Sequence, residues 1–202
     1  MMATGHQVVG ITFGVGALTL LPQLVPHADE PLSAVFFLGF VLFGSLLPDI
    51  DMPNSKLGHK FWRGLLTLFT LAFTIYLFVP RYLDLYREEL KVFLMLLLPV
   101  LLIIRSHRKM THSLLFVGML IGYSWFIEEW LNIQWFYLSG LIIGVVSHLS
   151  ADYLTKRGIP LVYPFSSKHK RFFITFRTGS AIEKAVVYSL VLWNIWYINL
   201  IF

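Results

Sequence analysis

Apolar runs long enough to cross a lipid bilayer recur along this chain, and they restrict its fold more than any other feature. The 202 residues are 57% hydrophobic and only 13% charged, with a mean hydropathy of +0.72. A soluble domain is typically about a quarter charged. Because every backbone polar group must be hydrogen-bonded within the bilayer, the expected spanning element is the α-helix. The sequence therefore predicts an all-α, polytopic membrane helix bundle, with residues 1–202 forming a single domain.

Seven membrane helices account for these apolar runs. Their expected ranges are 7–26, 32–48, 62–80, 90–105, 113–130, 135–152 and 182–201. The fifth and sixth helices are separated only by a short polar turn around Asn132. The chain has no cysteine, which excludes disulfides, thiolate metal sites and a cysteine nucleophile.

Lys and Arg residues lie mainly on one side of the predicted bundle. With the N-terminus in the cytoplasm, thirteen of the 16 basic residues fall in the inner connections or at the start of the last helix. Only Arg81, Arg87 and Lys91 fall on the outer side. Cytoplasmic connections of membrane proteins carry an excess of basic residues. We therefore expect a multi-pass protein of the plasma or inner membrane with a cytoplasmic N-terminus.

His148 and Asp152 form the most informative polar pair, because both lie at the end of an apolar run. Residues four apart share one face of a helix. Ionisable groups in or beside a membrane helix are costly and are usually functional. The pair fits one arm of a metal site. The alternative is a structural hydrogen bond between the imidazole and the carboxylate.

Three further groups of candidate ligands fall on the same predicted membrane face. Asp49 and Asp51 lie between two prolines, where they can chelate a cation or cap backbone N–H groups at a helix end. His107 and His112 precede the fifth helix and are either ligands or interfacial residues. His6 begins the first helix. The predicted orientation therefore allows all of these residues to meet His148 and Asp152 at the cytoplasmic face.

The candidate ligands are imidazoles and carboxylates without a thiolate. This donor set suits Zn²⁺ best, with Mn²⁺ or Fe²⁺ as alternatives. More than four candidates leave room for one or two ions, and a two-metal site can clamp both oxygens of a phosphate displacement. The candidate metal ligands are His6, Asp49, Asp51, His112, His148 and Asp152.

The segment that follows this pair is too rich in Gly and Pro to be helical. Residues 155–165 mix basic, aromatic and apolar side chains, and Lys168, Lys170 and Arg171 follow closely. A basic patch of this kind favours anionic phosphates, including those of lipid headgroups. The alternative is that these residues serve only as a topology signal and an interfacial anchor.

These ordered motifs resemble the YdjM family of bacterial and archaeal inner-membrane proteins, described as membrane-bound metal-dependent hydrolases. The motifs are an early His6, Leu47-Pro48-Asp49-Ile50-Asp51, His107-Arg108-x-x-Thr111-His112-Ser113, and His148-x-x-x-Asp152 followed by Tyr163-Pro164-Phe165. The resemblance covers the length of the chain. It implies metal-dependent hydrolysis, and a more remote similarity to zinc-dependent phospholipase C implies phosphate esters as substrates.

We therefore expect a metal-dependent hydrolase whose site faces the cytoplasm and whose substrate is a phosphoester of a membrane lipid. His107 would orient the attacking water or protonate the leaving group, and Asp51 is a second candidate catalytic residue. The phosphate oxygens would be held through bidentate hydrogen bonds by Arg105, Arg108 or Arg157. No nucleic-acid partner is expected.

Two other classes of membrane protein fit the same residues. In a transporter, the His and Asp residues would bind a passing cation, and only Glu128 and Glu129 would extend the path toward the outer side. In a scaffold or regulator, a structural metal would be bound without turnover of any lipid. Cation uptake into vesicles and lipid hydrolysis distinguish these three classes.

Overall fold

The computed structural model describes residues 1–21, 31–49, 56–78, 81 and 109–201. Within these ranges the regular elements are helices, accompanied by two isolated β-bridges. This confirms the all-α class predicted from the sequence. The chain divides into two compact units, of which the first comprises Met1–Pro48 with His112–Phe202 and the second comprises Asp49–Thr111.

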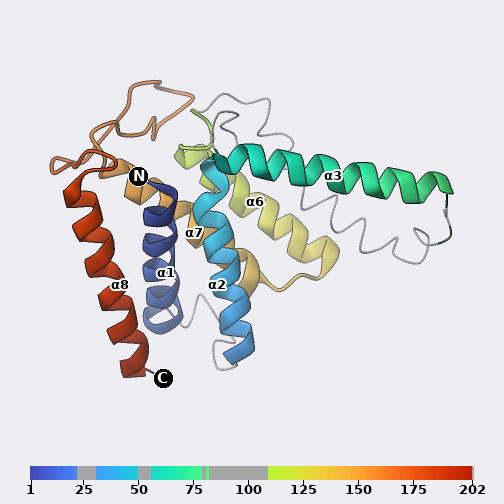
Figure 1. Cartoon of the computed structure of the whole chain (residues 1–202), viewed down its shortest axis with the longest axis horizontal. Coiled ribbons are helices and arrows are strands. Elements are labelled where there is room, and N and C mark those ends of the chain that lie inside the picture. The colour runs from blue at the N-terminus through green and yellow to red at the C-terminus, as the bar shows by residue number, and fades with distance from the viewer. Residues whose placement is uncertain (22–30, 50–55, 79–80, 82–108, 202) are drawn as a thin grey trace. The chain divides into compact units, whose positions relative to one another are not determined.

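The described helices follow the predicted apolar runs, with shifted ends (Figure 1). The first unit holds α1 (Ala3–Leu20), α2 (Pro31–Leu46), α6 (Leu114–Leu131), α7 (Trp135–Tyr153) and α8 (Ala181–Ile201), and the second unit holds α3 (Lys56–Phe78). The first helix begins four residues earlier than predicted, so that His6 falls inside it. The predicted helix 90–105 lies outside the described residues.

Local sequence signals set both ends of α6. Ser113 is its N-cap, and the Ser113 hydroxyl accepts a hydrogen bond from the backbone N–H of Phe116. At the other end Asn132 adopts a left-handed conformation, with φ of 53°, and its N–H donates to the carbonyl oxygen of Glu128. Both residue types are preferred at these positions. The Ser113 cap places His112 directly before the helix.

Two glycines allow α2 and α7 to approach each other closely. A Cβ atom on Gly144 would lie 2.2 Å from the carbonyl oxygen of Val41, and one on Gly44 would lie 2.2 Å from that of Leu141. Small residues at such crossings let helix backbones come together in membrane bundles. The backbone of α2 is therefore within reach of the polar side chains of α7.

The remaining contacts of the first unit complete a helix bundle. Phe37 of α2 packs on Phe136 of α7, with ring centroids 5.1 Å apart, in a fully buried apolar cluster. Buried Asn194 of α8 donates a hydrogen bond of 3.0 Å to the hydroxyl of Thr12 in α1. These contacts hold α1 between α8 on one side and the pair of α2 and α7 on the other, as Figure 1 shows.

One helical segment among the described residues, Pro31–Asp49, is long and apolar enough to cross a membrane by length and composition. This finding does not confirm the predicted seven spans. The helices nevertheless expose many large apolar side chains on their outer faces. On α8 these are Ile182, Val186, Tyr188, Leu192, Trp193, Ile195, Trp196 and Leu200.

Candidate metal centre

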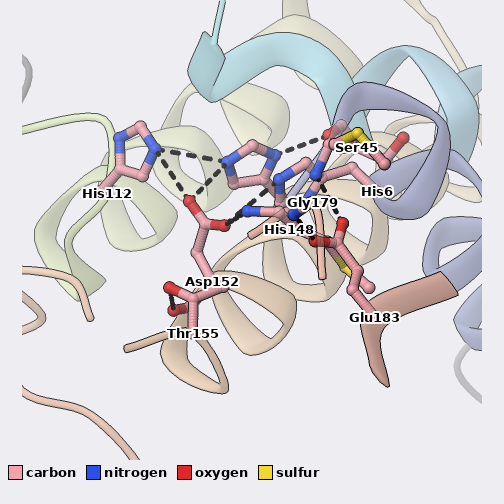
Figure 2. A network of polar contacts seen from close by, with 10 residues as sticks. His6, Ser45, His112, His148, Asp152, Thr155, Gly179 and Glu183 are labelled. Atoms are coloured by element: carbon pink, nitrogen blue, oxygen red, sulfur yellow. Dashed lines mark hydrogen bonds and ion pairs between the residues drawn. The ribbon is translucent and has the colours of Figure 1, made fainter. Parts of the chain in front are cut away.

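A polar cluster forms where several helices of the first unit begin or end (Figure 2). His6 comes from the first turn of α1, and His112 immediately precedes α6. His148 and Asp152 come from the last two turns of α7. The structure thus brings together four of the six candidate ligands from three separate parts of the sequence.

His148 is fully buried, and its orientation is set by a backbone group. Its Nδ1 lies 2.7 Å from the carbonyl oxygen of Ser45 in α2. A carbonyl oxygen can only accept, so Nδ1 must carry the proton. In the neutral imidazole the lone pair is then on Nε2, which is the arrangement typical of a metal-ligating histidine. The close crossing of α2 and α7 makes this contact possible.

The lone pair of His148 points at two other electron-pair donors. Its Nε2 lies 3.3 Å from Nε2 of His112. Oδ2 of Asp152 lies 3.7 Å from the Nε2 atoms of both histidines. His112 and His148 are buried, and the Asp152 side chain is only 17% exposed. Three buried donor atoms that face one another need a proton or a cation between them, because desolvated lone pairs repel.

The other oxygen of Asp152 faces the beginning of the chain. Oδ1 forms an ion pair with the α-amino group of Met1 and lies 3.3 Å from Nε2 of His6. The ring of His6 stacks on that of His148, with centroids 3.7 Å apart. Among the described residues Nδ1 of the fully buried His6 has no partner, and the contact of its Nε2 with Asp152 falls outside hydrogen-bond geometry. A buried imidazole without hydrogen bonds is costly unless it serves another purpose.

The geometry of these donors fits a metal ion. Ligand atoms of His112, His148 and Asp152 all lie within 4.8 Å of one another. A tetrahedral zinc ion, with metal–nitrogen distances of about 2.0–2.1 Å, separates two ligand nitrogens by roughly 3.3–3.4 Å. The distance between the two Nε2 atoms agrees with that value. A hydrogen bond from His112 to His148 is the alternative explanation of the same contact.

Glu183 belongs to this region, although the sequence analysis did not single it out. Its carboxylate is fully buried and accepts hydrogen bonds from the backbone N–H groups of Met2, at 2.8 Å, and Gly179, at 2.6 Å. The signal that identifies it is the capping-box pattern Ser180-x-x-Glu183 at the start of α8. That pattern places Glu183 at a helix start, but it does not predict the bond to Met2.

Two of the other predicted site residues, Asp49 and Arg157, are described, and four lie outside the described residues. Asp49 closes the 3₁₀ turn Leu47–Asp49 after α2 and is the first residue of the second unit. Arg157 is exposed in the loop after α7. The predictions for Asp51, Arg105, His107 and Arg108 lie outside the described residues.

Together, the helical fold and the His/Asp cluster define a helix-bundle protein with a candidate metal centre. The chain belongs to the YdjM inner membrane protein family, whose family model matches residues 1–201. It is thus a membrane protein of a family named for the inner membrane, as the sequence motifs predicted. No solved structure matches the chain.

Two curated relatives illustrate this membership. The chain is 34% identical to inner membrane protein YdjM of Escherichia coli (strain K12) over 153 residues, which is 75% of this chain and 61% of that protein. It is 32% identical to the uncharacterized protein YvsG of Bacillus subtilis (strain 168) over 162 residues, or 79% of this chain and 76% of that protein. The chain therefore spans less than two thirds of the length of the first relative.

Proposed function

We propose that the protein is a membrane-embedded, metal-dependent hydrolase that cleaves a phosphoester of a membrane lipid. The observation that supports this most directly is the convergence of His112, His148 and Asp152 on one point. Two imidazole nitrogens and a carboxylate oxygen form a donor set that suits Zn²⁺, with Mn²⁺ or Fe²⁺ as alternatives. Catalytic zinc sites commonly use three protein ligands and keep a further position open.

We further propose that the bundle spans the membrane seven times, with its N-terminus and the metal centre at the cytoplasmic side. One observation supports the embedding in a membrane, and a second supports the orientation. The large apolar side chains on the outer face of α8 suit a lipid environment better than water. The loop after α7 follows the metal centre directly and has six Lys and Arg residues but no Asp or Glu, as expected for a cytoplasmic connection.

Each residue of the centre has a distinct role in this proposal. A bound divalent ion would supply Lewis acidity toward a phosphoryl oxygen and toward water. The Ser45 carbonyl holds His148 in the tautomer that presents Nε2. Asp152 supplies negative charge that offsets part of the charge of a bound divalent ion. His6 and Asp49 are candidates to extend the ligand set.

Other residues are candidates to bind the phosphate and to transfer protons. Arg157 follows Asp152 by five residues and is exposed, so its guanidinium can hold phosphate oxygens. Arg105 and Arg108 are further candidates for this role. His107 is the candidate to protonate the leaving oxygen, and Asp51 is a second candidate acid or base.

The experiment that tests this function combines metal analysis with a turnover assay. The protein is purified in mild detergent, its metals are quantified by mass spectrometry, and it is incubated with a total lipid extract. We expect about one or two zinc ions per chain and release of phosphate or diacylglycerol. A His148→Ala variant should lose both, whereas His169→Ala, which changes an exposed loop histidine, should lose neither.

The outcome distinguishes a hydrolase from a protein with a structural metal and from one with no metal at this site. Stoichiometric metal without release of phosphate or diacylglycerol would contradict the hydrolase and support a structural metal. Wild-type metal content in His148→Ala would contradict the metal centre itself. It would instead support a hydrogen-bonded histidine cluster.

A further inference from the structure

The connection between α7 and α8, residues 154–180, has a well-defined backbone although it contains no helix or strand. Ile159 and Lys170 pair in antiparallel fashion through two hydrogen bonds of 3.0 and 2.8 Å. The N–H of Phe172 donates to the carbonyl oxygen of Tyr153 at the end of α7. The loop is therefore anchored to the helix that carries His148 and Asp152.

Buried residues and a specific glycine reinforce this anchoring. The Ile159 side chain is 2% exposed, so it fastens the loop to the first unit. Gly158 has a φ of +63°, and a Cβ atom there would lie 2.4 Å from the carbonyl oxygen of Lys170. The backbone N–H of Leu114 donates to the carbonyl oxygen of Leu161, which ties the loop to the start of α6.

Large apolar side chains project from this anchored loop into the surroundings. Phe165 is 91% exposed, Phe173 is 83% exposed and Ile174 is 68% exposed. Isolated exposed apolar residues are common, but three strongly exposed ones within residues 165–174 of a hydrogen-bonded loop are unfavourable in water. The hydrogen bonds of Ile159 with Lys170 and of Phe172 with Tyr153 hold the backbone on either side of these residues in place.

Basic side chains lie between the apolar ones in the sequence. Lys168 and Lys170 are exposed, and Arg171 donates from Nη1 to the carbonyl oxygen of Lys156 while remaining exposed. No Asp or Glu occurs between Asp152 and Glu183. Aromatic side chains combined with uncompensated Lys and Arg are the pattern that binds anionic membrane surfaces.

We propose that the surface formed by Phe165, Lys168, Lys170, Phe173 and Ile174, here called the loop surface, docks onto anionic phospholipid headgroups. The apolar side chains enter the boundary between headgroups and acyl chains, and the two lysines contact the phosphates. Figure 1 shows the loop extending from the end of the first unit at which α1 and α8 begin. The Phe172 N–H is bonded to the carbonyl oxygen of Tyr153, the residue after Asp152, so docking brings lipid headgroups toward the end of α7 that carries the candidate metal centre.

The test uses a single fluorescent label, because the chain contains no natural cysteine. Ser167→Cys lies within the loop, is exposed, and leaves the loop surface unchanged. The labelled full-length protein is reconstituted into nanodiscs of DOPC or of DOPC with DOPG, each with a doxyl-labelled lipid as quencher. A second label at Leu192→Cys, on the exposed face of α8, reports insertion of the bundle itself.

We expect the Ser167→Cys label to be quenched, and quenched more strongly when DOPG is present. Lys168→Gln with Lys170→Gln should remove at least about half of the DOPG-dependent quenching, because each basic residue contributes separately to binding an anionic surface. The matched control, Lys60→Gln with Lys109→Gln, removes two exposed lysines outside the loop and should have no effect. Quenching at Leu192→Cys should not depend on DOPG.

Two results would overturn this assignment. Absence of quenching at Ser167→Cys, with normal quenching at Leu192→Cys, would show that the loop does not dock on lipid. Equal quenching with and without DOPG would show that anionic headgroups are not its partner. Neither result depends on hydrolysis, and the metal content of the lysine variants should equal that of the unsubstituted protein. Failure of this inference is therefore distinguishable from failure of the proposed function.

Discussion

Two largely buried carboxylates in the first unit have different surroundings. Glu183 accepts hydrogen bonds from backbone N–H groups on both of its oxygens. Asp152 directs Oδ2 toward the Nε2 atoms of His112 and His148, at 3.7 Å from each. The Glu183 carboxylate is thus bound by backbone N–H groups, whose positions are fixed. The Asp152 carboxylate pairs with the Met1 α-amino group through Oδ1, but its Oδ2 faces imidazole nitrogens that can themselves act as metal ligands.

This difference separates a structural carboxylate from a candidate ligand. The negative charge of Glu183 is already balanced by peptide dipoles at the start of α8, so the residue joins that helix to the beginning of the chain. The charge of Asp152 is not balanced in this way on its Oδ2 side. A cation between Asp152, His112 and His148 would complete that arrangement. We therefore expect substitutions at the two carboxylates to affect different measurements.

The largest expected effect is the loss of metal when a donor of the centre is removed. Asp152→Ala and His148→Ala should each lower metal affinity by more than about 100-fold, since even changes outside the ligand shell cost about 10- to 100-fold. Glu183→Gln should keep the metal. Metal content after dialysis against a weak chelator measures this directly. Equal loss of metal in Glu183→Gln and Asp152→Ala would contradict the assignment of Asp152 as a ligand and Glu183 as a structural residue.

A smaller effect on the metal should follow from moving α2 away from α7. Gly144→Ala places a Cβ atom 2.2 Å from the carbonyl oxygen of Val41, so the helices must separate. The Ser45 carbonyl then withdraws from His148, and metal affinity should fall by about 10- to 100-fold. Titration with a competing chelator measures the change.

The matched control for this substitution is Gly122→Ala in α6, where an added Cβ atom would meet nothing within 4 Å. It should leave metal affinity unchanged and raise helix stability by up to about 1 kcal/mol. Wild-type affinity in Gly144→Ala would show that the Ser45 contact is not needed to orient His148.

Glu183→Gln should reduce stability without reducing metal content. The amide offers one acceptor oxygen where the carboxylate offers two, so either the Met2 or the Gly179 N–H loses its partner. Loss of a hydrogen bond to a charged group costs about 1.5–3 kcal/mol. Denaturation in detergent, followed by circular dichroism, measures the free energy of unfolding. An unchanged midpoint would contradict the structural role assigned to Glu183.

The smallest effect is expected for a substitution in residues 154–180, the loop between Asp152 and Glu183. Gly158→Ala puts a Cβ atom at a left-handed position and close to the Lys170 carbonyl oxygen. The conformation alone costs roughly 1–2 kcal/mol. Limited proteolysis should cut residues 154–180 faster, while metal content stays the same. A fall in metal content would show that the loop supports the centre as well as the lipid surface.

Much of the fold follows from local sequence patterns. The apolar runs predicted six of the described helices, because the need to satisfy backbone groups in a membrane favours helix over any other open structure. Ser113 and Asn132 mark the ends of α6 through their capping chemistry. Gly158 and Pro160 explain why the segment after Asp152 is a loop. The helix ends were less predictable, since α1 begins four residues before its expected start.

The candidate ligands were predictable as residue types at helix ends, but their partners were not. His148 and Asp152 stood out because ionisable groups are rare in apolar helices. The partner of His148 is a backbone carbonyl of Ser45, and a carbonyl carries no sequence signal of its own. Glu183 was recognisable as a helix-capping residue, yet its bond to Met2 joins positions 181 residues apart.

The sequence by itself determined that this is an all-α chain of the YdjM family with imidazoles and carboxylates at the ends of apolar segments. Only the tertiary structure decided which of them meet. Gly44 and Gly144 bring α2 onto α7, and this crossing places a carbonyl oxygen on Nδ1 of His148 and leaves Nε2 facing His112 and Asp152. The physical reason is that the residue type alone sets which atom can bind a metal. The direction in which that atom points depends on packing between segments that are distant in the sequence.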